Sequence, residues 1–237
     1  MLYLIGLGLN LDSLSIGSLE AIEKSRVYLE SYTVDFPYKI EELEEKVGKK
    51  IEKLGRKEVE SDKLIKLAKK EDICLLVYGS PLFATTHISL INDLRKEKIK
   101  FKVIFNASVF DAVSLSGLEL YKFGKITSLP DWKDKGKSLS FLDVVEKNKS
   151  IKAHSLVLVD IGLSFKDAIE QLKIACEEKK IKLEKIVVCS CLGTSKEKIF
   201  YGFIEDISDS LVKSPFCFII PGEMHFVEEE SLKSFEV

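Results

Sequence analysis

The stretch that decides the fold runs from residue 73 to residue 87. It begins with ICLLVY at 73–78, a continuous apolar run of the kind that forms a strand buried on both faces of a sheet. GSPLFATTH follows at 79–87, where glycine and proline end the strand and a helix is expected to begin near Thr86. Strand and helix ends leave backbone groups unpaired, so this junction predicts a site for a small polar ligand.

Two further loops of the same kind support this prediction. The loop at 6–9 follows an apolar strand expected over 2–5, and the loop at 106–109 follows a strand expected over 101–105. Open α/β sheets bind ligands outside the carboxyl ends of their strands. If the three strands are parallel, the three loops meet at one edge of a sheet and shape one pocket.

Strand-like and helix-like segments alternate along the chain, which indicates an α/β fold with mostly parallel strands. The first half predicts strands over 2–5, 27–30, 51–54, 73–78 and 101–105. Helices are expected from a cap at Ser18 and over 40–47, 62–70, 86–98 and 107–115.

The second half predicts a different arrangement. Its expected strands are 126–129, 155–160, 185–191, 200–204 and 216–220, and its expected helices are 141–147 and 165–179. The strand at 200–204 follows its predecessor without a helix, which favours an antiparallel neighbour and a mixed sheet. The pattern changes after Gly117, so we expect two domains, 1–115 and 116–237.

Composition narrows the class of protein. The 36 basic and 38 acidic residues are interspersed, which gives no overall electrostatic footprint for nucleic acid or an anionic membrane but leaves room for a local patch. The chain has no run of about 20 apolar residues and no basic leader, so we expect neither a membrane span nor a signal peptide. Its five cysteines lie mostly in apolar runs, which favours reduced thiols and a cytoplasmic location.

Known chemical motifs are mostly incomplete. Gly6 and Gly8 begin a dinucleotide-binding pattern, but its third glycine would fall on Leu11, which argues against a nicotinamide cofactor. The three histidines and the Cys189-x-Cys191 pair lack metal-ligand spacing, so no metal is expected. His87 beside the Gly-Ser-Pro turn has two equally open interpretations, a ligand contact or a satisfied polar core residue.

Several blocks together resemble the diphthine synthases, a family of S-adenosylmethionine-dependent enzymes in the tetrapyrrole-methylase-like group. The most specific blocks are ATTH at 84–87 and GLELYKFG at 117–124; LYLIGLGL at 2–9, NAS at 106–108, DI at 160–161 and PGEMHF at 221–226 complete the set. The resemblance implies two α/β domains, a mostly parallel N-terminal sheet and a mixed C-terminal sheet, with a cleft between them that holds the cofactor. It also implies a homodimer.

The resemblance also implies a reaction and a cofactor site. Family members use S-adenosylmethionine to methylate the amino group of 2-(3-amino-3-carboxypropyl)histidine on translation elongation factor 2, in the synthesis of diphthamide, and S-adenosylhomocysteine is the other product. No metal and no particular catalytic side chain are implied. By motif position, the cofactor contacts fall on eight residues: Leu9, Ser80, Phe83, Ser108, Val109, Val159, Leu192 and Phe216.

This chain departs from the family pattern in three places. Ser80 stands where the family usually has aspartate, Cys191 stands where an arginine is common, and the segments between Lys125 and Asp160 and after Ile161 are shorter than usual. A serine still accepts a hydrogen bond, but an ionised acceptor makes one roughly twice as strong. Two other functions therefore stay open: methylation of a tetrapyrrole ring carbon, and cofactor binding without activity.

Overall fold

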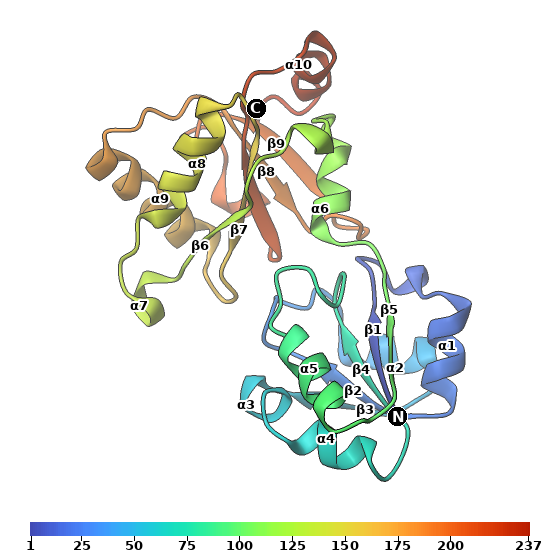
Figure 1. Cartoon of the computed structure of the whole chain (residues 1–237). Coiled ribbons are helices and arrows are strands. Elements are labelled where there is room, and N and C mark those ends of the chain that lie inside the picture. Colours follow the sequence, from blue (N-terminus) through green and yellow to red (C-terminus); the bar gives the residue numbers. More distant parts are fainter. The chain divides into compact units, whose positions relative to one another are not determined.

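A computed structural model describes residues 1–237 as two compact units, Met1–Val109 and Phe110–Val237, and each unit contains one five-stranded sheet (Figure 1). The division falls shortly before the boundary expected after residue 115. The reason is that the ring of Phe110 packs edge-on against that of Phe123, with centroids 5.9 Å apart, and so joins the second unit.

The first sheet is entirely parallel, with the strand order β3-β2-β4-β1-β5. Its strands are β1 (Leu2–Gly6), β2 (Arg26–Glu30), β3 (Ile51–Leu54), β4 (Ile73–Val77) and β5 (Phe101–Ile104). The helices of this unit are α1 (Ile16–Glu23), α2 (Ile40–Val47), α3 (Arg56–Val59), α4 (Lys63–Ala68) and α5 (Ile88–Lys96), with a short 3-10 turn η1 (Leu11–Ser13).

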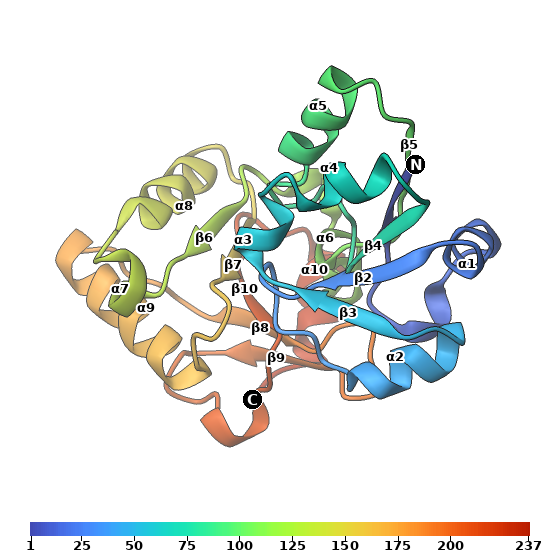
Figure 2. The same cartoon turned by 90° about the horizontal axis from the view of Figure 1, so that it is seen from below.

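Helices cover both faces of this sheet, which explains the continuous apolar run of β4 (Figure 2). On one face Leu75 packs with residues of α4 and α5, and on the other face Leu76 packs with residues of α1 and α2. Alternate residues of a strand point to opposite faces, so every position of β4 must be apolar, and all five are fully buried.

Local signals set the helix ends. The α2 helix ends at Gly48, as its position predicts, because Gly48 adopts the left-handed conformation with φ of 67°. The start of α1 differs from the expectation at Ser18. Ser15 is the cap, and its side chain accepts a hydrogen bond from the Ser18 N–H at 3.1 Å, while Ser18 itself is buried in the first turn.

The second sheet is mixed, with the order β6-β7-β10-β8-β9, in which β6 and β7 are parallel and the other pairs antiparallel. Its strands are β6 (Thr127–Leu129), β7 (Ser155–Val159), β8 (Ile186–Ser190), β9 (Lys198–Gly202) and β10 (Phe216–Ile220). The expected antiparallel pairing of the segment near residue 200 with β8 is confirmed.

The α-helices in the second half are α6 (Val109–Ala112), α7 (Trp132–Lys135), α8 (Ser140–Ser150), α9 (Phe165–Lys179) and α10 (Phe226–Lys233); its 3-10 turns are η2 (Val113–Ser116), η3 (Leu120–Lys122) and η4 (Asp209–Leu211). The helix expected over 107–115 is instead α6 followed by η2. The chain turns at Gly117, where φ is 87°.

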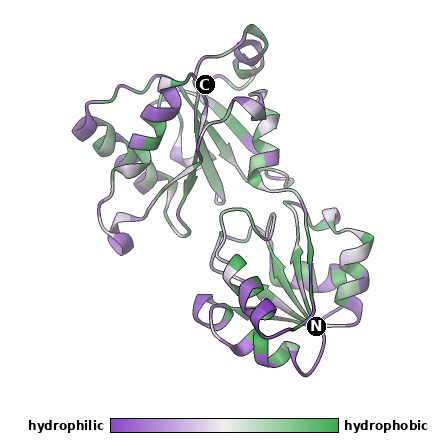
Figure 3. Cartoon of the chain, viewed as in Figure 1, coloured by the Kyte–Doolittle hydropathy of each residue, from purple (hydrophilic) through white to green (hydrophobic).

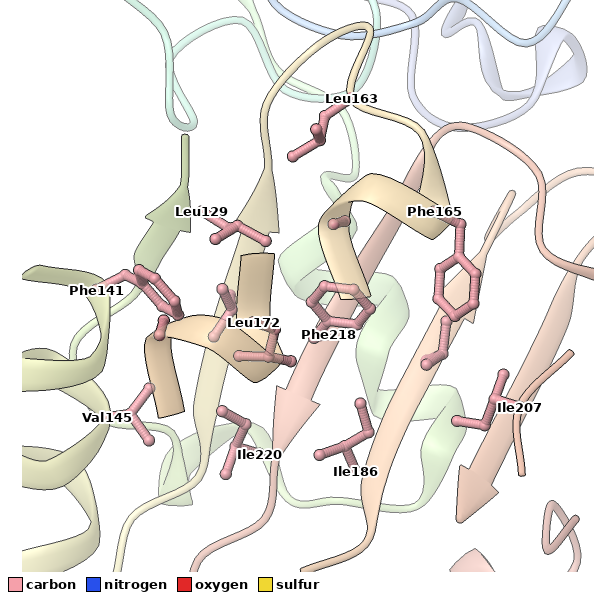
Figure 4. Close-up of a cluster of buried hydrophobic side chains, with 14 of the residues drawn as sticks. Leu129, Phe141, Val145, Leu163, Phe165, Leu172, Ile186, Ile207, Phe218 and Ile220 are labelled. Atoms are coloured by element: carbon pink, nitrogen blue, oxygen red, sulfur yellow. The ribbon is translucent and has the colours of Figure 1, made fainter. Parts of the chain in front are cut away.

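The core of the second unit lies between the sheet and helices α8 and α9 (Figure 4). Phe141 and Val145 of α8, Leu129 of β6, Leu172 of α9 and Phe218 of β10 all belong to this cluster (Figure 4). Strands in both units are predominantly hydrophobic and most helices combine a hydrophilic with a hydrophobic side (Figure 3), as amphipathic packing requires. None of the helices has the length and apolar character needed to cross a membrane.

Candidate functional site

Three loops meet at the carboxyl edge of the first sheet, as the sequence predicts. They follow β4, β1 and β5, which are adjacent and parallel. The first two loops are joined directly, because the Gly79 N–H donates to the Gly8 carbonyl at 2.9 Å and the Gly8 N–H donates to the Gly79 carbonyl at 3.2 Å. Both glycines have positive φ, 70° for Gly8 and 78° for Gly79, a conformation that side chains disfavour.

Asn106 joins the loop after β5 to the chain at the end of β1. Its side-chain Nδ2 donates to the carbonyls of Gly6 at 3.3 Å and Ser13 at 2.9 Å, and its Oδ1 accepts from the Ala107 N–H at 2.9 Å. The packing here leaves no room for a side chain at Gly6, because a Cβ on that residue would lie 2.7 Å from the Gly79 carbonyl oxygen. The three loops therefore form one tightly joined edge.

Two tyrosines hold the main chain of Leu9, one of the predicted cofactor contacts. The hydroxyls of Tyr38 and Tyr78 donate to the Leu9 carbonyl at 2.9 Å and 3.2 Å. Phe36 completes this group, with its ring edge-on to both tyrosines and centroids 5.6 Å away in each case. Sequence reasoning missed this aromatic group; Tyr78, at the end of the apolar run, was the one available signal.

A buried carboxylate orders the segment that carries Tyr38. Glu30, at the carboxyl end of β2, is 4% exposed and accepts hydrogen bonds from the backbone N–H groups of Tyr32 at 3.1 Å and Thr33 at 3.2 Å. The Thr33 hydroxyl donates to its other oxygen. Buried charges need such partners, so Glu30 fixes the turn that leads from β2 into the aromatic group.

His87 is a satisfied polar core residue, which decides between its two interpretations. It is 1% exposed and directly precedes α5. Its Nδ1 lies 3.0 Å from the Pro81 carbonyl, which can only accept, so Nδ1 carries the proton. Its Nε2 then accepts from the Tyr32 hydroxyl at 3.4 Å. The ring holds the turn after β4 in place.

The second unit also brings predicted contacts to one edge of its sheet. Val159 ends β7, and Leu192 follows the end of β8. Phe216 begins β10, which lies between β7 and β8 and runs antiparallel to both, with Phe216 opposite Ser190. The carboxyl ends of two strands and the start of the third therefore coincide.

Charged and main-chain contacts shape this second edge. Cys191 has φ of 50°, and its N–H donates to the Pro215 carbonyl at 2.8 Å. Asp160, next to Val159, forms an ion pair with Lys135 at 2.6 Å. Burial acts to raise the pKa of Asp160, but hydrogen bonds from Lys135 and the Asp131 N–H outweigh it and lower that pKa.

Two of the sequence blocks, 117–124 and 221–226, are held by a buried network in the second unit. Glu228 of α10 is 1% exposed; its oxygens accept from the backbone N–H groups of Glu119 at 3.0 Å and His225 at 2.8 Å, and from the Lys122 ammonium. The His154 Nε2 donates to Glu228 at 2.9 Å, since its Nδ1 accepts from the Gly222 N–H at 2.9 Å.

Eight predicted cofactor contacts thus form two groups. The structure brings five of them to the loops of the first sheet and three to the edge of the second; the five are Leu9, Ser80, Phe83, Ser108 and Val109, and the three are Val159, Leu192 and Phe216. Their role in cofactor binding stays a prediction. The structure adds Glu30, Tyr38 and Tyr78 to the residues of the candidate site.

Comparison with known proteins identifies the class. The model of the tetrapyrrole (corrin/porphyrin) methylases matches residues 1–208, and the chain belongs to this family of methyltransferases. The diphthine synthase of Methanocaldococcus jannaschii is 37% identical over 98% of each chain. The human diphthine methyl ester synthase is 34% identical, over 100% of this chain and 95% of its own. A crystal structure of a diphthine synthase superimposes with a TM-score of 0.89 at 31% identity, covering 100% of this chain and 96% of its own.

Proposed function

We propose that this protein is an S-adenosylmethionine-dependent methyltransferase of diphthamide biosynthesis, and that it methylates the amino group of 2-(3-amino-3-carboxypropyl)histidine on translation elongation factor 2. The observation that carries the proposal is similarity to diphthine synthases along nearly the whole chain. The blocks at 84–87 and 117–124 support the same reaction.

The three-loop edge suits the proposed cofactor. All residues of 6–9, 79–83 and 106–109 are uncharged, which fits a ligand that carries a sulfonium cation. Gly79 has no side chain and the nearest atom to the position of a Cβ there is 3.9 Å away, so a ligand can approach its main chain closely, and Leu9 and Phe83 offer apolar surface for a nucleoside. We therefore assign cofactor binding to the five residues of this edge and to Val159, Leu192 and Phe216.

The cofactor, when bound, supplies an already activated methyl group, so the protein has to bind, orient and exclude water. The attacking amine must be neutral, and its proton can pass to solvent before the transfer. None of the side chains described above is needed as a base. We also propose a homodimer in the cytoplasm, which light scattering of the purified protein and imaging of a tagged protein would test.

The reaction is tested by incubating the protein with radiolabelled S-adenosylmethionine and elongation factor 2 that carries the aminocarboxypropyl-histidine. We expect label in that protein and none in a control with unmodified histidine. Mass spectrometry of the product separates methylation of the amine from formation of a methyl ester, the product named for the human relative. Cofactor binding without transfer to this acceptor would contradict the proposal. Transfer of label to a tetrapyrrole offered in a parallel assay would favour methylation of a ring carbon instead.

Ser80 provides a test of the cofactor site. A Ser80→Asp variant restores an ionised acceptor at the end of β4, and we expect cofactor binding to tighten by about 1 kcal/mol. Isothermal titration calorimetry measures this change. Weaker binding by a folded variant would show that Ser80 does not face the cofactor.

A further inference from the structure

A surface hollow lined by lysines lies on the second unit beside the predicted cofactor residues. It has a volume of about 280 Å³ and is lined by Ser195, Lys196, Glu197, Lys198, Ser210, Leu211 and Lys213. Three of these seven side chains are cationic and one is anionic. The carboxylate of Glu197 accepts a hydrogen bond from the Gly193 N–H at 2.7 Å, within its own turn.

The three lysines around this hollow have no ion-pair partner, whereas lysines elsewhere in this unit include both paired and unpaired ones. Lys135, Lys137, Lys152 and Lys173 pair with carboxylates, whereas no carboxylate lies within 4.0 Å of the ammonium groups of Lys196, Lys198 or Lys213, all of which are exposed. Unpaired like charges around one hollow repel one another, and an anion between them removes that repulsion.

The hollow is tied to the edge of the second sheet. The Ser190 hydroxyl donates to the Lys213 carbonyl at 2.7 Å, and the Lys213 N–H donates to the Ser190 oxygen at 2.9 Å. Ser190 ends β8 two positions before Leu192, and Lys213 precedes Phe216 by three positions. Any large substrate that reaches this edge with one side chain must also cover the surface beside it.

We propose that the lysine hollow binds an acidic segment of the protein substrate, and so helps to dock that substrate for methylation. This inference rests on the proposed function. The unpaired ammonium groups and the Ser195 and Ser210 hydroxyls are donors for carboxylates. Leu211 is 42% exposed. Its side chain can pack against an apolar part of a peptide segment, whereas a free inorganic anion has no such part.

The test compares wild type with a triple variant, Lys196→Gln, Lys198→Gln and Lys213→Gln. Exposed ion pairs are weak, about twofold in affinity each, so we expect the KM for modified elongation factor 2 to rise roughly tenfold. The kcat and the Kd for S-adenosylmethionine should be unchanged. The fall of kcat/KM with added salt should also be less steep in the variant.

A matched control removes three other exposed lysines of the same unit, through Lys147→Gln, Lys149→Gln and Lys182→Gln. These precede β7 and β8 and so lie toward the opposite edge of the sheet. We expect the control to keep the wild-type KM.

The possible results separate the inference from the function on which it rests. If wild type does not methylate the factor, the proposed function fails. If wild type is active and the triple variant has the same KM, the docking inference fails alone. Competition by a poly-glutamate peptide should inhibit wild type more than the variant. Competition by an RNA oligonucleotide but not by the peptide would overturn the inference in favour of a nucleic-acid site.

Discussion

Replacing Glu228 by glutamine should destabilise the second unit strongly. The carboxylate accepts hydrogen bonds from Glu119, Lys122, His154 and His225 while only 1% exposed. Glutamine keeps the shape but removes the charge, and its amide NH₂ must replace one of the two accepting oxygens. In the wild type each carboxylate oxygen accepts from two donors. In the variant the amide NH₂ would face two donors and could accept from neither, and the Lys122 ammonium would lose its anion.

The size of the effect follows from two estimates that agree. Burial acts to raise the pKa of Glu228, but its four hydrogen bonds hold that pKa at about 2, against 4.5 for an ordinary glutamate. At about 1.4 kcal/mol per pKa unit, this shift corresponds to about 3 kcal/mol. Removing one partner of a buried ion pair independently costs about 3–5 kcal/mol. We therefore expect the free energy of unfolding to fall by about 3–4 kcal/mol near neutral pH.

Urea denaturation followed by tryptophan fluorescence reports the unfolding of the second unit, because the single tryptophan of the chain, Trp132, lies in that unit. The control is Glu229→Gln on the same helix. Glu229 is exposed, and its variant should stay within about 0.5 kcal/mol of wild type. A loss below about 1 kcal/mol for Glu228→Gln would refute the reasoning, since the buried carboxylate would then add little.

The pH dependence provides a second check. A carboxylate whose pKa is lower in the folded state stabilises fully above its unfolded pKa and loses this contribution as the pH falls toward its folded pKa. For Glu228 that window runs from about 4.5 down to about 2. The stability difference between wild type and Glu228→Gln should therefore shrink as the pH falls below 4.5. Burial lowers the pKa of His154, so its contribution is lost on acidification too, beginning below its unfolded pKa of about 6.5.

Three other predictions concern the first unit. Gly6→Ala should lower its stability by about 1–3 kcal/mol in urea denaturation followed by circular dichroism, because the new Cβ would overlap the Gly79 carbonyl; wild-type stability would contradict the packing. Tyr78→Phe removes a hydrogen bond to Leu9 and should weaken S-adenosylmethionine binding about fivefold by calorimetry, whereas unchanged affinity would mean that Leu9 is held without it. Burial raises the pKa of Cys74 to about 11, so a thiol reagent near pH 8 should modify it only after unfolding, and rapid labelling of the native protein would oppose this.

The candidate site could be predicted in part because its loops carry local signals. Glycine, proline and asparagine directly after apolar strands mark the three loops, and the doubly wound pattern of strands and helices predicts parallel neighbours. The adjacency of β4, β1 and β5 confirmed that the loops share one edge. Tyr78 was the one local signal for the aromatic group, and its partner could not be predicted because its hydroxyl meets a carbonyl 69 residues away.

His87 illustrates the same limit. Its sequence neighbours allowed either a ligand contact or a core position, and only its burial and its two ring partners decided between them. The start of α1 was misplaced for a smaller reason. Ser15 and Ser18 are both residues that cap helices, and the choice between them depends on which side chain turns back to the helix, as Ser15 does.

The sequence by itself determined the two kinds of sheet, most strands and helices, and the family, because these depend on residue periodicity and on short blocks that neighbours along the chain define. Only the tertiary structure decided which polar groups meet. Glu119 and Glu228 are 109 residues apart and share a hydrogen bond, and Lys213 comes to lie beside Ser190 through the pairing of β8 with β10. Burial and charge pairing are properties of such distant contacts, and pattern along the chain does not contain them.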